Sequence, residues 1–342
     1  MRVAMYYSNK DVRLEEMPTP TIGPGELLVR VEASGICGSD LMEWYRIHKA
    51  PLVLGHEIAG EIAEVGEAVN GYKVGDHISA SHHVPCNTCH YCLTSHPTTC
   101  DTLRKTNFYP GGFAEFVRLP AINVDRGVYL LPDEVSYEEA TFIEPLACVV
   151  RAQKRAHLQP GDTVLVLGSG ISGILHIHCA RMLGATRIIA TDIVEYRLET
   201  ARWFGADHAI NAREDVPAKV RELNQGRLAD KVIVCTGAVS AITQALHSIE
   251  RGGTVLFFAP TEQNATVPLS VNQLFWRTDI TLTTSYAGDR ADHVTALQLI
   301  SAKRVAVKDM ITHRLPLAET GVGFELVAKA TRSIKVIIEP QR

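Results

Sequence analysis

TVLVLGSGISG, residues 163–173, joins an apolar run to a glycine-rich turn and then to a helix-like segment. The turn has the spacing G-x-G-x-x-G, formed by Gly168, Gly170 and Gly173. This spacing indicates dinucleotide binding more strongly when it follows a strand and begins a helix. Gly168 permits a tight turn, Gly170 lets a pyrophosphate approach the backbone, and Gly173 lets helix and strand pack closely. The helix start at Ile171 offers free N–H groups to phosphates. The stretch predicts a dinucleotide-binding turn, and the alternative is a similar turn that binds nothing.

Strand-like and helix-like runs alternate after this turn. Such alternation is typical of a parallel, doubly wound α/β sheet. We therefore expect a Rossmann domain over about residues 151–284. The runs are RIIATD, EYRLETARWFGA, DHAIN, KVIVCTG, SAITQALHSIE and GGTVLFFAP, within residues 187–260.

The second strand-like run ends in an acidic residue, Asp192. A carboxylate about 20 residues beyond the glycine turn accepts hydrogen bonds from the adenosine ribose, and it repels a 2′-phosphate. NAD is therefore favoured over NADP as the cofactor. Arg197 leaves the alternative open, because it could pair with a phosphate or simply cap the ribose and adenine pocket.

Length and charge set limits on the remaining chain. A chain of 342 residues predicts two domains, and residues 1–150 have the short, glycine-broken runs of a β-rich domain. The net charge of −4 provides no basic field for nucleic acid or anionic lipid. Neither a signal peptide nor an apolar run long enough for a membrane span is evident. These features predict a cytoplasmic protein with no nucleic-acid or membrane partner.

A four-cysteine cluster stands in PCNTCHYCLTSHPTTC, residues 85–100: Cys86, Cys89, Cys92 and Cys100. A reducing cytosol disfavours structural disulfides, and four thiolates at about 2.3 Å complete a tetrahedral zinc shell. Since a closed shell has no place for a substrate, we expect a structural zinc lobe here. The alternatives are a CxxC redox pair and chance clustering.

A second set of candidate ligands is scattered over short motifs. GICGSD contains Cys37 and Asp40, LGHEIAG contains His56 and Glu57, and TFIEPLA contains Glu144. Together with GGFAEF, the cysteine lobe and the glycine turn, these motifs follow one another in a fixed order. In this order they resemble the zinc-dependent medium-chain dehydrogenases, most closely the polyol branch typified by sorbitol and threonine dehydrogenases. The resemblance extends over essentially the whole chain.

The resemblance implies a second, catalytic zinc bound by Cys37, His56 and a carboxylate from Glu57 or Glu144. Three protein ligands would leave one position for a substrate oxygen. Asp40 would orient His56, and Ser39 would hydrogen-bond the substrate oxygen. Such an enzyme oxidises a secondary alcohol of a polyol, sugar acid or cyclitol and passes hydride to NAD. The resemblance also implies that the Rossmann domain is inserted in a GroES-like catalytic domain, and that residues 285–342 belong to this catalytic domain.

One position departs from the family pattern. Met42 stands where the family often has a histidine that passes the proton to solvent, so water, Glu43 or His48 would have to serve. A threonine-type amino-alcohol dehydrogenase and a non-catalytic nicotinamide-binding protein remain alternatives. The resemblance further implies a homo-oligomer, a tetramer or a dimer, braced by the cysteine lobe.

Overall fold

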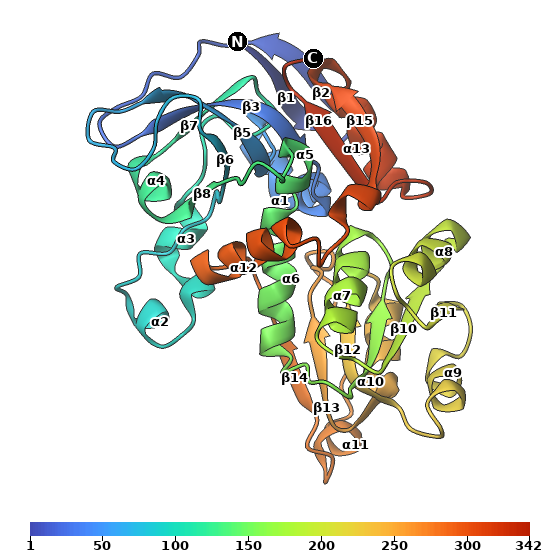
Figure 1. The fold of residues 1–342 in the computed structure, drawn as a ribbon. Coiled ribbons are helices and arrows are strands. Elements are labelled where there is room, and N and C mark those ends of the chain that lie inside the picture. Colours follow the sequence, from blue (N-terminus) through green and yellow to red (C-terminus); the bar gives the residue numbers. More distant parts are fainter. The chain divides into compact units, whose positions relative to one another are not determined.

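The chain forms two units, one inserted within the other, in a computed structural model that describes residues 1–342 (Figure 1). Unit 1 consists of Met1–Ala147 together with Ala287–Arg342, and unit 2 consists of Cys148–Tyr286. No helix combines the length and the apolar content that crossing a lipid bilayer requires.

Unit 2 is built on a six-stranded sheet in the order β11-β10-β9-β12-β13-β14. All five neighbouring pairs are parallel. Counted from β9, this is the strand order 3-2-1-4-5-6 of a dinucleotide-binding fold, as the alternating runs predict. The strands are β9 (Thr163–Leu167), β10 (Arg187–Asp192), β11 (His208–Asn211), β12 (Ala229–Val234), β13 (Ile249–Phe257) and β14 (Thr281–Thr284).

The inner strands of unit 2 are apolar because helices cover the sheet. Every residue of β9 is buried, and its leucines join a core with residues from β10, β12, β13 and α10. Parallel strands covered on both faces have near-continuous apolar sequences, which explains the run that precedes the glycine turn. The helices are α7 (Ile171–Met182), α8 (Glu195–Trp203), α9 (Val216–Leu223), α10 (Val239–Ser248) and α11 (Val271–Phe275).

Unit 1 is mainly antiparallel and contains two sheets. The seven-stranded sheet has the order β15-β16-β3-β5-β6-β8, with β7 also paired to β3, and the three-stranded sheet has the order β2-β1-β4. The strands are β1 (Arg2–Ser8), β2 (Asp11–Glu16), β3 (Leu27–Gly35), β4 (Leu52–Val53), β5 (Glu57–Val65), β6 (His77–Ala80), β7 (Phe116–Leu119), β8 (Val128–Leu130), β15 (Ile311–Pro316) and β16 (Lys335–Glu339).

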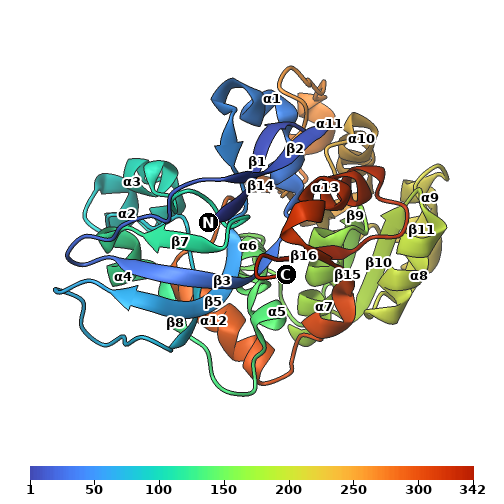
Figure 2. The same ribbon diagram turned by 90° about the horizontal axis from the view of Figure 1, so that it is seen from above.

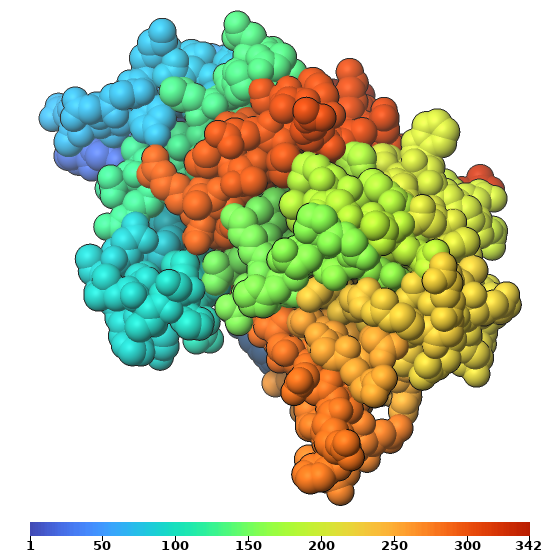
Figure 3. Space-filling view, turned by 60° about the horizontal axis from the view of Figure 1, so that its bottom comes forward, coloured from blue at the N-terminus to red at the C-terminus, as the bar shows by residue number.

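Short helices link these strands. The α-helices are α1 (Glu43–Arg46), α2 (His90–Leu93), α3 (Asp101–Lys105), α4 (Ala121–Gly127), α5 (Tyr137–Ala140), α12 (Arg290–Ser301) and α13 (Thr320–Lys329), and α6 (Ile143–Arg155) runs from unit 1 into unit 2. The 3-10 helices are η1 (Gly38–Leu41), η2 (Ile47–Lys49), η3 (Pro97–Thr99), η4 (Val307–Met310) and η5 (Leu317–Glu319). The segment with α2, η3 and α3 is a cyan projection of unit 1 in the space-filling view (Figure 3).

The end of the chain completes the large sheet of unit 1. Strand β16 pairs antiparallel with β3 through Ile337 opposite Gly35 and Ile338 opposite Ser34, so both chain termini lie in this unit (Figure 2). Because Gly35 ends β3 directly before the GICGSD loop, this pairing brings the C-terminal strand to the candidate catalytic residues.

Candidate metal and cofactor sites

The four lobe cysteines point their sulfurs at a common centre. Their ligand atoms all lie within 4.8 Å of one another, and none of these cysteines forms a disulfide. The Sγ atoms of Cys89 and Cys92 are 3.6 Å apart, those of Cys86 and Cys100 3.6 Å, and those of Cys86 and Cys92 4.0 Å. A tetrahedron with zinc–sulfur bonds of about 2.3 Å has edges of about 3.8 Å. The lobe therefore fits a closed zinc shell.

Backbone donors support thiolates in the lobe. The N–H of Cys89 donates to Sγ of Cys86 at 3.3 Å, and the N–H of Cys86 donates to Sγ of Cys100 at 3.4 Å. Hydrogen bonds from Thr88 and from the Cys89 N–H lower the pKa of Cys86 to about 5, whereas burial raises the pKa of Cys92 to about 12. Four like thiolates cannot all ionise without a cation, so the arrangement depends on a metal.

A second group lies where two strands of unit 1 meet. Cys37 follows β3, and His56 and Glu57 stand at the start of β5. Ligand atoms of these three residues lie within 4.8 Å of one another. The pairing of β3 with β5 sets Gly35 opposite Glu57, which brings the GICGSD and GHE motifs together. The group has one sulfur, one nitrogen and one oxygen donor, which is a three-ligand set that suits a zinc with an open position.

Asp40 contacts two residues of this group, Cys37 and His56. Its buried carboxylate accepts a hydrogen bond from the Cys37 N–H at 3.0 Å, and its Oδ1 lies 3.3 Å from Nδ1 of His56. Burial opposes charge on both side chains, but their mutual attraction lowers the pKa of Asp40 and raises the pKa of His56 well above its usual value. The contact at Nδ1 leaves Nε2 of His56 for a metal.

Ser39 lies in the same turn as the cysteine. Its Oγ donates a hydrogen bond to Sγ of Cys37 at 3.4 Å. The hydroxyl is therefore next to the atom that would bind the metal. This is the place from which a serine can contact a substrate oxygen on the open metal position.

Glu57 has a second partner. Lys335, the first residue of β16, forms an ion pair with the Glu57 carboxylate, and both side chains are fully buried. Nζ of Lys335 also lies 3.3 Å from the carbonyl oxygen of Ile36. A Cβ at Gly35 would overlap both the carboxylate and the lysine chain, so glycine is required at that position. The carboxylate that would complete the metal site is thus shared with a buried cation.

Two other residues named from the sequence are not among these three mutually close ligands. Glu144 stands in the first turn of α6, half-buried, and the group of mutually close ligand atoms does not contain it. Met42 ends η1, where its N–H donates to the Ser39 carbonyl at 3.4 Å, and its side chain offers no protonatable atom.

The glycine turn of unit 2 has the contacts that its spacing predicts. Gly168 has φ +94°, a left-handed conformation that favours glycine, and a Cβ at Gly173 would overlap the carbonyl oxygen of Gly168. Gly170 caps the N-terminus of α7, which begins at Ile171. The first N–H groups of α7 can therefore donate hydrogen bonds to a pyrophosphate, and the glycines let it approach the backbone closely.

Asp192 lies beside this turn at the end of β10. Its Oδ2 accepts the N–H of Ser169 at 2.9 Å, and its Oδ1 accepts the N–H groups of Ile193 at 2.8 Å and Val194 at 3.0 Å. Arg197 is 3.9 Å from the same carboxylate and within 4 Å of the position that a Gly170 Cβ would occupy. Turn, carboxylate and arginine thus lie together, in an arrangement that could hold the adenosine half of a dinucleotide.

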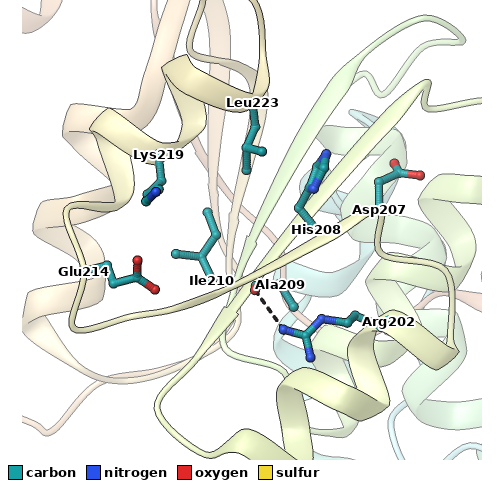
Figure 4. Close-up of a pocket in the computed structure, with 8 residues that line it drawn as sticks. All are labelled: Arg202, Asp207, His208, Ala209, Ile210, Glu214, Lys219 and Leu223. Carbon is teal, nitrogen blue, oxygen red and sulfur yellow. Dashed lines mark hydrogen bonds between the residues drawn. The ribbon is translucent and has the colours of Figure 1, made fainter.

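A shallow pocket of about 290 Å³ lies at the β11 edge of unit 2 (Figure 4). Its charged residues already have partners: Arg202 donates to the Ala209 carbonyl at 3.2 Å, and Lys219 pairs with Glu222 at 2.9 Å. With its charges satisfied by neighbouring groups, this pocket has no free donor set for a ligand.

Comparison with protein families accounts for both units. Residues 23–133 match the alcohol dehydrogenase GroES-like domain, and residues 172–302 match the zinc-binding dehydrogenase family. Sorbitol dehydrogenase of Bacillus subtilis is 32% identical over 100% of this chain and 98% of its own length. The chain belongs to the zinc-binding dehydrogenases. This confirms the prediction of a zinc-dependent medium-chain dehydrogenase, its fold class and zinc as a cofactor.

Other zinc-binding dehydrogenases are similar over the same length. Sorbitol dehydrogenase of Gallus gallus is 33% identical over 96% of this chain and 93% of its own. The solved structure of alcohol dehydrogenase TADH from Thermus sp. ATN1 superposes with a TM-score of 0.87 at 29% identity, covering 99% of each chain. The similarity therefore includes both units and the return of the chain to unit 1.

Lys335 and His82 belong to no motif that the sequence singles out. A lysine inside the apolar strand SIKVIIE is a signal for a buried charge, but its partner could not be identified without the β16–β3 pairing. His82 stands in SHHVPC directly before the cysteine lobe, and its ring centroid is 4.7 Å from that of His56. The sequence signal for this position is the pair of adjacent histidines, His82 and His83.

Proposed function

We propose that this zinc-binding dehydrogenase oxidises a secondary alcohol of a polyol-like small molecule to a ketone and transfers the hydride to NAD. The observation that carries the proposal is the group formed by Cys37, His56 and Glu57, a three-ligand set in a family of zinc-binding dehydrogenases. The names of its sorbitol dehydrogenase relatives support a polyol-like substrate.

Each residue of this group has a proposed role. Zinc, when bound, supplies Lewis-acid chemistry that lowers the pKa of a substrate hydroxyl. Asp40 fixes the orientation of the His56 ring through Nδ1, and Ser39 hydrogen-bonds the substrate oxygen and takes part in removing its proton. Because Met42 cannot carry that proton onward, water takes it to solvent.

Lys335 balances the negative charge of the Glu57 carboxylate. Its ammonium group neutralises Glu57, so the glutamate can bind a metal or remain with the lysine without leaving a buried charge unpaired. Glu144 is the other carboxylate that the family pattern offers, and exchange between the two glutamates remains a proposal.

The remaining assignments follow the two units. Unit 1 is the proposed catalytic domain with a structural zinc in its lobe, and unit 2 is the proposed nucleotide domain. The hydrogen-bonded carboxylate of Asp192 favours a ribose with a free 2′-hydroxyl, which supports NAD over NADP. A cytoplasmic location remains a prediction.

A homo-oligomer is the proposed state of the protein. Strand β14 is an edge of the six-stranded sheet, and the segment before it, orange in Figure 3, exposes several large apolar side chains. An unpaired edge strand next to exposed apolar side chains supports pairing with a second copy. The exposed side chains are Leu269, Val271, Phe275 and Trp276.

The test is nicotinamide reduction by the purified protein over a panel of alditols, sugar acids, cyclitols and threonine, with NAD or NADP, before and after treatment with a chelator. Chelator-sensitive turnover of one hydroxyl class with NAD supports the proposal. Turnover of threonine alone would favour an amino-alcohol dehydrogenase. No turnover by a protein that holds two zinc ions and binds NAD would favour a non-catalytic binding protein.

A further inference from the structure

His82 presents a hydrogen-bonding atom beside the candidate catalytic group. Its Nδ1 is buried and has no hydrogen-bond partner, and its ring centroid is 3.8 Å from that of His83. The backbone here is fixed, because the buried Asn123 donates to the carbonyl oxygens of Ser81 and His82, both at 2.9 Å. A buried polar atom without a partner is costly unless a ligand or water satisfies it. An unpartnered ring nitrogen of this kind, on a ring beside that of His56, indicates a position for a substrate oxygen.

Arg46 brings a positive charge to the same place. Its Nε donates to the carbonyl oxygen of Ser39 at 3.2 Å, and its guanidinium carbon lies 4.8 Å from the ring centroid of Tyr45. Arg46 therefore lies next to Ser39, whose hydroxyl contacts the candidate ligand Cys37.

The carboxylates near this arginine have other partners, and none of them forms an ion pair with it. Asp40 accepts the Cys37 N–H and faces His56, Glu57 pairs with Lys335, and the carboxylate of Glu43 accepts the N–H of Asn9 at 3.1 Å. Arg46 itself has only a carbonyl oxygen and an aromatic ring as partners. The guanidinium of Arg46 therefore lies beside Ser39 without an ion-pair partner.

We propose, as an extension of the proposed function, that the substrate is a polyhydroxy acid whose carboxylate pairs with Arg46 while Nδ1 of His82 hydrogen-bonds one of its oxygens. In the reaction the alcohol carbon gives a hydride to the nicotinamide and the hydroxyl proton goes to water. The carboxylate is unchanged and serves only for binding. A neutral polyol would satisfy His82 but leave the guanidinium without an anion, whereas guanidinium and carboxylate groups match in shape and charge.

The test compares an alditol with the aldonate of the same carbon skeleton, sorbitol with gluconate and mannitol with mannonate. We expect kcat/KM to be at least about tenfold higher for the aldonates, mainly through KM, and Arg46→Gln to lower the aldonate-to-alditol ratio by about tenfold. Arg46→Lys should keep part of the preference. Lys49→Gln is the matched control, because Lys49 is an exposed cation 4.1 Å from the ring centroid of the same Tyr45, and this variant should retain the ratio.

His82 is tested separately. His82→Phe should raise KM for the aldonate, and His82→Asn, which keeps a hydrogen-bonding atom near Nδ1, should restore much of the affinity. A second readout is the melting temperature, which gluconate should raise in the wild type and not in Arg46→Gln.

The inference is wrong if alditols are used as well as aldonates, or if Arg46→Gln lowers both activities equally, since the arginine then only positions Ser39. Either result leaves the proposed function intact. Absence of turnover with every secondary alcohol would instead refute the proposed function itself.

Discussion

The cysteine lobe and the Cys37–His56–Glu57 group both have the ligands of a metal site, but they differ in where those ligands come from along the chain. The lobe takes four identical donors from 15 consecutive residues, 86–100, and little besides the metal would hold their thiolates together. The other group takes three different donors from two strand ends, and Asp40 and Lys335 hold its residues in place. A local, closed site stabilises its own segment. A site whose ligands are held by the sheet needs only three protein ligands, so the fourth coordination position of the metal stays open for a substrate.

The largest expected effect comes from removing a ligand of the open site. Cys37→Ser should lower kcat/KM by at least about a thousandfold, or about 4 kcal/mol, because the hydroxyl of the substrate would no longer be made acidic. The bound zinc should fall from two to one per chain, and the melting temperature should change little. Zinc analysis and calorimetry beside the kinetics check this. A large loss of thermal stability would remove the distinction between the two sites.

The ion pair beside the open site comes next. With no metal at the open site, Lys335→Met leaves the buried carboxylate of Glu57 without a cation and should cost about 3–5 kcal/mol of unfolding free energy. Adding Glu57→Gln should recover part of that loss. The matched control is Lys329→Met, which breaks an exposed pair with Glu325 and should cost less than about 1 kcal/mol. Denaturant titrations of the four proteins measure these values, and equal losses for both lysines would show that the sheet does not depend on this pair.

Removing a lobe ligand should lower thermal stability more than turnover, which is the opposite of the result expected for Cys37→Ser. Cys89→Ala should release the lobe zinc and lower the melting temperature by about 5–10 °C, since metal binding and folding of such a segment are coupled. The value of kcat should fall by less than about tenfold. Melting as in the wild type together with abolished turnover would instead assign chemistry to the lobe.

A buried histidine outside both metal sites predicts how the stability of the protein depends on pH. Burial lowers the pKa of His176 to about 3, so between pH 6.5 and 3 the unfolded chain binds a proton that the folded chain does not. Stability should therefore fall as the pH drops below 6.5, by up to about 1.4 kcal/mol per pH unit from this residue. His176→Leu should reduce that slope in denaturant titrations at pH 7, 6 and 5. An unchanged slope would mean that other groups carry the acid sensitivity.

The sequence predicts the features that depend on neighbours along the chain. The apolar run before Gly168, the alternating strands and helices of unit 2 and the four-cysteine spacing are local patterns, and the structure contains each of them. The partner of Glu57 was not predictable, because Lys335 is 278 residues away and meets it only through strand pairing. The same holds for His82, because its ring lies beside that of His56 only through the packing of unit 1.

The most direct test of the difference between the two sites is stepwise removal of zinc by a chelator, with zinc per chain, secondary-alcohol turnover and melting temperature measured on the same samples. The two-site assignment predicts that turnover falls to zero as the first equivalent leaves, while the melting temperature falls only with the second. Turnover and melting temperature that decline together from the first equivalent, or turnover that survives the loss of one zinc, would contradict it.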